Sequence, residues 1–193
     1  MPVAFSMEER LEISEKLMEG ARLFVREQSA RKITVEQLTA YAGISKGAFY
    51  LFYPAKEYLF YELLRRMHEE LYAPAMRLLS KTSANPAELL TQAILEGCRA
   101  LDESGLVRFW EQDAPEILSA VPAEERTEQL VKERAVFHEF LSGRQPLRVS
   151  EEQAMNALRG LILTVPMRKK LGNDYPEILL WMAQGVCAQL FGG

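Results

Sequence analysis

The chain has 193 residues, of which 48% are apolar and 26% charged, and its formal net charge is −4. This length fits one or two domains with a substantial core, and the composition is ordinary for a soluble globular protein. No apolar run reaches the roughly 18 to 20 residues of a membrane span, and residues 1–10 lack the basic and apolar regions of a signal peptide. These features predict a cytoplasmic protein without membrane contact, in which Cys98 and Cys187 stay reduced.

Cap signals and apolar periodicity predict nine helices and no strand. The expected helices start near Ser6, Thr34, Ser45, Ala55, Asn85, Leu106, Pro122, Ser150 and Asp174. Prolines inside three of them should kink, interrupt or bend the helix, at Pro74, Pro115 and Pro166 respectively. The helix from residue 55 should run to about Lys81, and Asp174 should cap the last helix.

Residues 34–54 form a compact pair of short helices joined by a glycine turn. Thr34 and Gln37 have the capping-box spacing, and Gly43 is the residue type that most often ends a helix in a left-handed turn. Ser45 then caps a second helix, which Pro54 ends because the residue before a proline is pushed out of the α region. The pattern predicts a helix-turn-helix, whose second helix enters the major groove of DNA.

Positive charge gathers around this unit although the whole chain is acidic. Residues 31–56 contain one acid and four basic side chains, namely Arg31, Lys32, Lys46 and Lys56. Residues 61–193, in contrast, hold 15 basic and 19 acidic residues. DNA binding needs positive charge where the phosphates lie rather than a positive protein. The local patch therefore favours DNA binding, and the alternative is an ordinary solvated face.

The stretch from Thr34 to Leu59 resembles the end of the DNA-binding domain in the tetracycline-repressor (TetR) family. The family pattern is similar to T-V-x-x-[IL]-A-x-x-A-G-[VI]-S-x-G-x-[FL]-Y-x-x-F-x-x-K-E-x-L. The matching residues are Thr34, Val35, Leu38, Ala42, Gly43, Ile44, Ser45, Gly47, Phe49, Tyr50, Lys56, Glu57 and Leu59. The resemblance implies an all-α, nine-helix TetR-like fold. A three-helix DNA-binding domain would span residues 1–54, and a helical ligand-binding and dimerisation domain residues 55–193.

The same resemblance implies roles on DNA for the residues of this unit. Lys46 and Lys56 would neutralise phosphates, and Tyr50 and Thr34 would donate hydrogen bonds to them. Gly47 would let the backbone approach the DNA closely, and Ala48 would contact a thymine methyl. The candidate DNA-binding residues are therefore Thr34, Ser45, Lys46, Gly47, Ala48, Tyr50 and Lys56.

The chain departs from the family pattern in two places. Ser29 and Ala30 stand where the family usually ends its first helix with glycine and an aromatic residue. We therefore expect this helix to run slightly longer or to end in a different turn. Ala48 and Leu51 stand where a hydroxyl residue and a phosphate-binding histidine are common, so two possible phosphate donors are missing.

The last two helices are unusually apolar. Nearly every side of residues 178–191 is apolar or small, and a helix apolar all round must be buried on more than one face. A partner subunit is the expected second surface, and a fully internal core helix is the alternative. The family resemblance implies a homodimer that pairs these two helices with their copies in a four-helix interface.

The segment 106–118 carries Phe109 and Trp110 between polar residues on a helix that contains a proline. Such a helix cannot pack continuously and leaves space, and pockets combine apolar walls with a few polar anchors. Two interpretations stay open: plain core aromatics, or the wall of a ligand cavity, which the family resemblance favours. Phe137, His138 and Met155 on neighbouring helices are weaker candidates for the same cavity.

Motifs of common catalytic and metal sites are missing from the sequence. It has no glycine-rich phosphate loop, no H-E-x-x-H motif and no Cys/His cluster with metal-ligand spacing, so we expect no enzyme activity, metal or cofactor. The best interpretation is a homodimeric repressor that binds a palindromic double-stranded DNA operator and is released by a small-molecule effector of unknown identity. Two others stay open: a helical scaffold that binds DNA and another protein, and an all-α enzyme.

Overall fold

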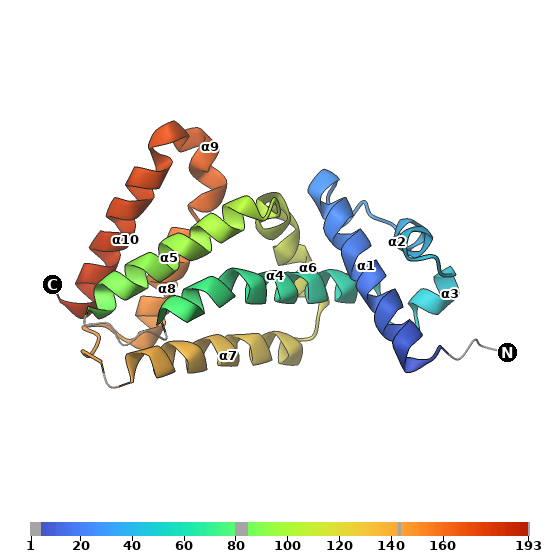
Figure 1. The fold of residues 1–193 in the computed structure, drawn as a ribbon, viewed down its shortest axis with the longest axis horizontal. Helices are drawn as coiled ribbons and strands as arrows, with labels where there is room; N and C mark the ends of the chain where they lie inside the picture. Colours follow the sequence, from blue (N-terminus) through green and yellow to red (C-terminus); the bar gives the residue numbers. More distant parts are fainter. Residues whose placement is uncertain (1–4, 80–84, 143, 193) are drawn as a thin grey trace. The chain divides into compact units, whose positions relative to one another are not determined.

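The computed structural model describes residues 5–79, 85–142 and 144–192. These residues form helices, turns and no strand, which confirms the predicted all-α fold (Figure 1). The chain divides into two compact units. Unit 1 contains Met1–Met67 and Arg108–Arg126, and unit 2 contains His68–Val107 and Thr127–Gly193. The functional division expected between residues 54 and 55 stays a prediction.

All nine segments predicted as helices are helical in the structure. Unit 1 contains α1 (Met7–Glu27), α2 (Val35–Ala42), α3 (Lys46–Phe49), the π-helix η1 (Phe109–Asp113) and α6 (Ala114–Ala120). Unit 2 contains α5 (Pro86–Glu103), α8 (Glu151–Ile162), the 3₁₀ helices η2 (Val165–Met167) and η3 (Gly172–Asp174), α9 (Arg168–Leu171) and α10 (Tyr175–Phe191). Helices α4 (Lys56–Leu79) and α7 (Ala123–Leu141) run from one unit into the other. The expected end of α4 near Lys81 lies outside the described residues.

Local cap chemistry explains where several helices start. Ser6, Thr34 and Ser150 each form the predicted capping box, with the hydroxyl accepting from the N–H three residues on and the side chain there reaching back. The side chain of Asn85 accepts from the next two available N–H groups of α5, and Pro86 fills the first helical position. Because these signals lie within four residues of each other, the sequence predicts them well.

The start of α10 differs from the prediction. Asp174 has a helical backbone (φ −80°, ψ −8°) at the end of η3, and its side chain makes no capping hydrogen bond. A side-chain cap needs an extended N-cap backbone, so the predicted cap at Asp174 is wrong. The bend expected at Pro166 is a full interruption, because α8 ends at Ile162 and Pro166 lies inside η2.

Pro115 changes the hydrogen-bond register of its helix and does not break it. The chain is helical without a gap from Val107 to Ala120, and the N–H of Ala114 donates to the carbonyl of Phe109, five residues back. A proline clashes with the carbonyl four residues before it in an α-helix, and the wider π-turn relieves this clash. The predicted interruption at Pro115 is therefore corrected to a π-helical turn.

In unit 1, α1 packs on α2, and α2 packs on α3. The fully buried side chains of this unit include Leu17, Ile33, Leu38, Phe49, Phe60 and Phe109. Gly20 brings α1 close to α2, because a Cβ added there would lie 2.9 Å from Cδ1 of Tyr41. This close approach fixes α2 against α1, and α2 in turn carries α3.

Helix α5 is the centre of unit 2 and packs on both α8 and α10 (Figure 1). Cys98 on α5 and Cys187 on α10 are buried and free. Burial raises the pKa of the Cys98 thiol to about 12 and also raises that of Cys187, so both thiols stay protonated near neutral pH. Among the described helices, none is both long and apolar enough to cross a bilayer.

Candidate functional site

The turn between α1 and α2 sets how the helix-turn-helix begins. Helix α1 ends at Glu27, and Gln28 has an extended backbone (φ −142°, ψ 163°). A tight turn follows, in which the N–H of Lys32 donates to the carbonyl of Ser29 at 2.9 Å and that of Ile33 to Ala30 at 3.3 Å. Helix α1 therefore does not extend to Ser29 and Ala30, which lie in this turn.

The two short helices are arranged as the sequence predicts. Gly43 ends α2 in the left-handed conformation (φ 72°, ψ 31°). The hydroxyl of Ser45 accepts from the N–H of Ala48 at 3.1 Å and caps α3. Hydrogen-bonded turns continue from α3 as far as Tyr53, whose N–H donates to the carbonyl of Phe49 at 3.1 Å. Phe49 is fully buried and anchors this helix, which leaves its opposite side exposed.

The exposed side of α3 carries Lys46, Gly47 and Tyr50. Tyr50 is 50% exposed, and a Cβ added at Gly47 would meet only the Ser45 hydroxyl at 3.9 Å. The ammonium of Lys46 donates to Oε1 of Glu36 on α2 at 2.6 Å, and this pair is exposed. The hydrogen bond raises the pKa of Lys46 and lowers that of Glu36. The exposed side of α3 therefore combines the Lys46 ammonium, the open backbone at Gly47 and the phenol of Tyr50.

Lys56, the other lysine expected on phosphate, has different surroundings. Its ammonium donates to the carbonyl oxygens of Ala30, Arg31 and Ile33, at 3.2, 2.8 and 2.7 Å. The hydroxyl of Thr34 accepts from the N–H of Gln37, and the N–H of Thr34 donates to Oε1 of Gln37. Both groups are therefore used in the cap of α2. The assignments of all seven candidate residues to DNA stay predictions.

A buried polar cluster lies behind the turn, and the sequence reasoning missed it. The hydroxyl of Ser29 donates to Oδ1 of Asp113 at 2.5 Å, and Asp113 is only 4% exposed. Its Oδ2 has no hydrogen-bond partner and lies 3.9 Å from Nη1 of Arg108. Arg108 also donates to the carbonyl of Val25 at 2.5 Å. The one sequence signal was Ser29 in a place where the family has glycine.

The five candidate ligand residues fall in different units. Phe109 is fully buried with its ring 6.3 Å from that of Phe60 in unit 1, and Trp110 is half-buried there. In unit 2, Phe137 and Met155 are buried, and His138 is exposed with Nδ1 3.0 Å from Oε1 of Glu151. Their role in ligand binding stays a prediction.

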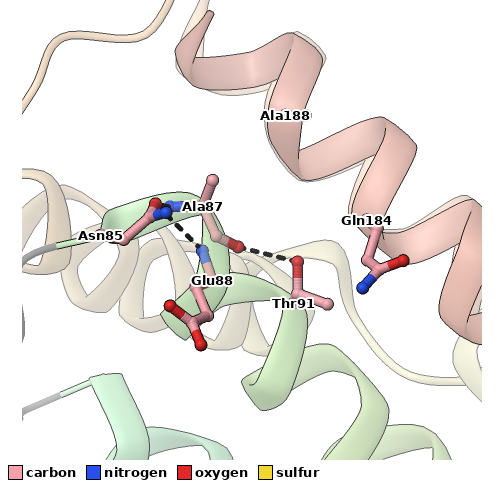
Figure 2. A pocket seen from close by; sticks show the side chains of 6 residues that line it. All are labelled: Asn85, Ala87, Glu88, Thr91, Gln184 and Ala188. Carbon is pink, nitrogen blue, oxygen red and sulfur yellow. Dashed lines mark hydrogen bonds between the residues drawn. The ribbon is translucent and has the colours of Figure 1, made fainter. Parts of the chain in front are cut away.

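Unit 2 contains a pocket between the start of α5 and α10, shown in Figure 2. Its volume is about 340 Å³, and its lining residues are Asn85, Ala87, Glu88, Thr91, Gln184 and Ala188. Two of the polar side chains drawn there have partners within α5, since Asn85 caps this helix and the hydroxyl of Thr91 donates to the carbonyl of Ala87 at 2.8 Å. None of the five candidate ligand residues lines this pocket.

Unit 2 exposes large apolar side chains on α10 and in the segment that joins α8 to α10. They are Trp181 on α10, Leu163 directly after α8, Met167 in η2 and Leu171 in α9. Gly160 on α8 and Gly185 on α10 are also exposed, and a Cβ added at either would meet no described atom within 4 Å. The other side of α10 is buried, with Ala183 and Cys187 fully enclosed. Because Trp181 is 59% exposed, α10 is not a fully internal helix of the protomer.

Comparisons with known proteins bear on the fold. No family model matches the chain, and no curated protein matches it significantly. Among solved structures, FadR from Bacillus subtilis in complex with stearoyl-CoA is similar with a TM-score of 0.64 and 20% identity, over 93% of this chain and 98% of that chain. A putative TetR-family regulator from Mesorhizobium loti has a TM-score of 0.62 and 17% identity, over 94% of this chain and 96% of that chain. RolR in complex with resorcinol has a TM-score of 0.58 and 17% identity, over 97% of this chain and 99% of that chain.

These likenesses run through nearly the whole length of both chains, so they concern the complete helical arrangement and not the helix-turn-helix alone. The identities are low, and they establish shared architecture rather than shared ligands. The chain therefore has the fold of the TetR-family transcriptional regulators.

Proposed function

We propose that this protein is a DNA-binding transcriptional regulator of the TetR type, a homodimeric cytoplasmic repressor that a small molecule releases from its operator. The observation that carries the proposal is the exposed side of α3. Phe49 fixes this helix from behind, while Lys46, Gly47 and Tyr50 face solvent. A short helix presented in this way fits the major groove.

Lys46 is the residue on which phosphate binding can be tested most simply. Its ion pair with Glu36 is exposed, and exposed pairs contribute only about 0–1 kcal/mol. A phosphate can therefore replace Glu36 as the partner of the ammonium. Each such contact releases counterions from the DNA and adds to the salt dependence of binding.

Substituting Lys46→Ala should weaken duplex binding by about 1 kcal/mol or more and reduce the salt slope by about one. Gel-shift titrations at two salt concentrations measure both quantities. Lys16→Ala is the matched control, because Lys16 forms an equally exposed pair with Glu12 on α1 at 2.7 Å. Unchanged affinity and slope for Lys46→Ala would remove Lys46 from the interface.

The exposed apolar side chains on α10 and in the segment between α8 and α10 support a homodimer. Mid-helix glycines cost roughly 1 kcal/mol relative to alanine, and no described atom lies within 4 Å of a Cβ added at Gly160 or Gly185. A second copy that packs closely on these helices would explain both glycines, because the lack of a side chain lets its helices approach. It would also cover Trp181 and Leu163. Two copies related by a two-fold axis would present two α3 helices to a palindromic site.

A small-molecule effector is the remaining part of the proposal. FadR and RolR are solved with stearoyl-CoA and resorcinol respectively, which supports an apolar or amphipathic effector here. Such a ligand releases DNA only if it binds one arrangement of the protein more tightly than another. Replacing Trp181 with Phe leaves Trp110 as the one tryptophan of the chain. An effector that binds near Trp110 should then change the fluorescence of Trp110 over the same concentration range in which it releases DNA. DNA binding insensitive to every metabolite tried would favour the scaffold.

A further inference from the structure

We propose that Lys56 is a positioning residue that builds the turn before the helix-turn-helix and makes no direct contact with phosphate. The inference rests on the proposed DNA-binding function and reassigns one of its candidate residues. It concerns the turn of residues 29–33, which joins α1 to α2.

All the hydrogen-bond capacity of this ammonium is in use. A lysine ammonium has three N–H donors and no acceptor. Its nitrogen lies 3.2, 2.8 and 2.7 Å from the carbonyl oxygens of Ala30, Arg31 and Ile33. Three convergent carbonyls therefore match the three donors one to one. A phosphate oxygen could bind this group only if one of those carbonyls gave up its partner.

Two of the three carbonyls belong to buried residues of the turn. Ala30 is 4% exposed and Ile33 fully buried, whereas Arg31 is exposed, and a buried carbonyl without a donor is costly. The turn itself supplies only one backbone hydrogen bond to these three oxygens, from the N–H of Ile33 to Ala30. Lys56 thus satisfies a turn that lacks enough internal donors.

The position of this turn decides where the recognition helix lies. Ile33 directly precedes Thr34, the cap of α2, and α2 continues through the Gly43 turn into α3. On the other side, Arg108 binds the carbonyl of Val25 and Asp113 binds Ser29. Lys56 is therefore one of two side-chain anchors of the turn, and losing it would let α2 and α3 shift together.

Lys46 offers a contrast within the same unit. Its side chain is 56% exposed, and its ammonium donates to the carboxylate of Glu36. It can exchange that partner for a phosphate, whereas Lys56 would have to release the turn. The two lysines should consequently respond differently to the same substitution.

The test measures binding of the full-length protein to a mixed-sequence 30-base-pair duplex by fluorescence anisotropy over a series of salt concentrations. Lys46→Met should reduce the salt slope by about one and leave the amide hydrogen exchange of Lys32 and Ile33 unchanged. Lys56→Met should keep the wild-type slope, bind several-fold more weakly at every salt concentration, and exchange the amide hydrogens of Lys32 and Ile33 at least tenfold faster. A reduced slope for Lys56→Met with normal amide exchange would overturn the proposal.

Lys56→Arg keeps the test decisive if the methionine variant folds poorly. Arginine retains the charge that a phosphate contact needs, but its planar fork cannot reproduce three convergent ammonium hydrogen bonds. It should show fast exchange at Lys32 and Ile33; wild-type affinity together with wild-type exchange would contradict a positioning role. If the wild-type protein fails to bind duplex DNA, the proposed function is wrong. The role of Lys56 in the turn is still tested in that case, because amide exchange is measured without DNA.

Discussion

At the scale of single residues, Glu36 and a DNA phosphate would compete for the ammonium of Lys46 on the exposed side of α3. Lys46 is paired with Glu36 at 2.6 Å, so a phosphate must displace a carboxylate to bind it. The carboxylate would also lie near the negative DNA backbone and repel it. If α3 binds DNA as proposed, Glu36 should oppose binding, and its removal should change the affinity in the opposite direction from the removal of Lys46.

Glu36→Gln should strengthen binding to duplex DNA by roughly 0.5–1 kcal/mol, because it removes a like-charge repulsion and leaves the Lys46 ammonium without a salt-bridge partner. Both side chains of the pair are exposed, so thermal unfolding should hardly change. Anisotropy titration at low salt measures the gain. Glu12→Gln, which breaks the matching pair with Lys16, should have a much smaller effect; equal or weaker binding by Glu36→Gln would place this pair away from the DNA.

At the scale of elements, a short hydrogen bond joins the π-helix η1 to the turn that follows α1. Ser29 and Asp113 lie 84 residues apart in the chain and meet at 2.5 Å. Asp113 is nearly enclosed and its second oxygen has no hydrogen-bond partner. The serine hydroxyl is thus the main donor to a buried carboxylate, and a buried polar group is costly to leave unpaired.

Ser29→Ala should lower the free energy of unfolding by about 1–3 kcal/mol, since it leaves the Asp113 carboxylate without this donor. Urea unfolding followed by circular dichroism measures the loss. Ser119→Ala is the control, because the Ser119 hydroxyl donates to the Glu116 carbonyl on an exposed helix. In an Asp113→Ala background the serine substitution should cost much less, and an equal cost in both backgrounds would show that the pair is not coupled.

The sequence predicts those parts of the elements that depend on near neighbours. The caps at Ser6, Thr34 and Ser150 were predicted because both partners lie within three residues. Asp174 has the same pattern, yet the preceding 3₁₀ turn holds its backbone in a helical conformation. Local pattern alone does not show which backbone a cap residue adopts.

Contacts between distant segments could not be predicted in this way. The partners of Lys56 lie 23 to 26 residues away, so a lysine in the family pattern was assigned to phosphate from resemblance alone. The exposed side of α3 was predictable, because Phe49 falls on the opposite side of a short capped helix. The ligand site was not, since an aromatic residue such as Phe109 has the same pattern in a core as in a pocket wall.

At the scale of the whole molecule, the proposed homodimer would pair two copies through α8, α10 and the exposed apolar side chains on α10 and in the segment between the two helices. The alanine at position 183 already belongs to the core of the protomer, being fully buried there. A test of the interface therefore needs an exposed position, where a new side chain does not disturb the protomer itself. Gly185 meets this requirement, because nothing lies within 4 Å of a Cβ added to it.

Gly185→Arg should convert a dimer into a monomer, because it places an unpaired charge where the second copy packs. Sedimentation velocity at micromolar concentration measures the mass, and circular dichroism should show unchanged helix content. Gln92→Arg on α5, also at an exposed position, should leave the dimer intact. A wild-type protein that sediments as a monomer would rule out this interface.

The central claim is that two copies of this chain read one duplex with their α3 helices, and selection of bound sequences from a random duplex library tests it most directly. Near physiological salt, the purified protein should enrich an inverted repeat whose half-site centres are separated by one helical turn, about 10–10.5 base pairs, or by a small multiple of it. Lys46→Ala should enrich the same repeat less strongly. Absence of any enriched sequence, or enrichment of a single half-site without its inverted copy, would contradict the account.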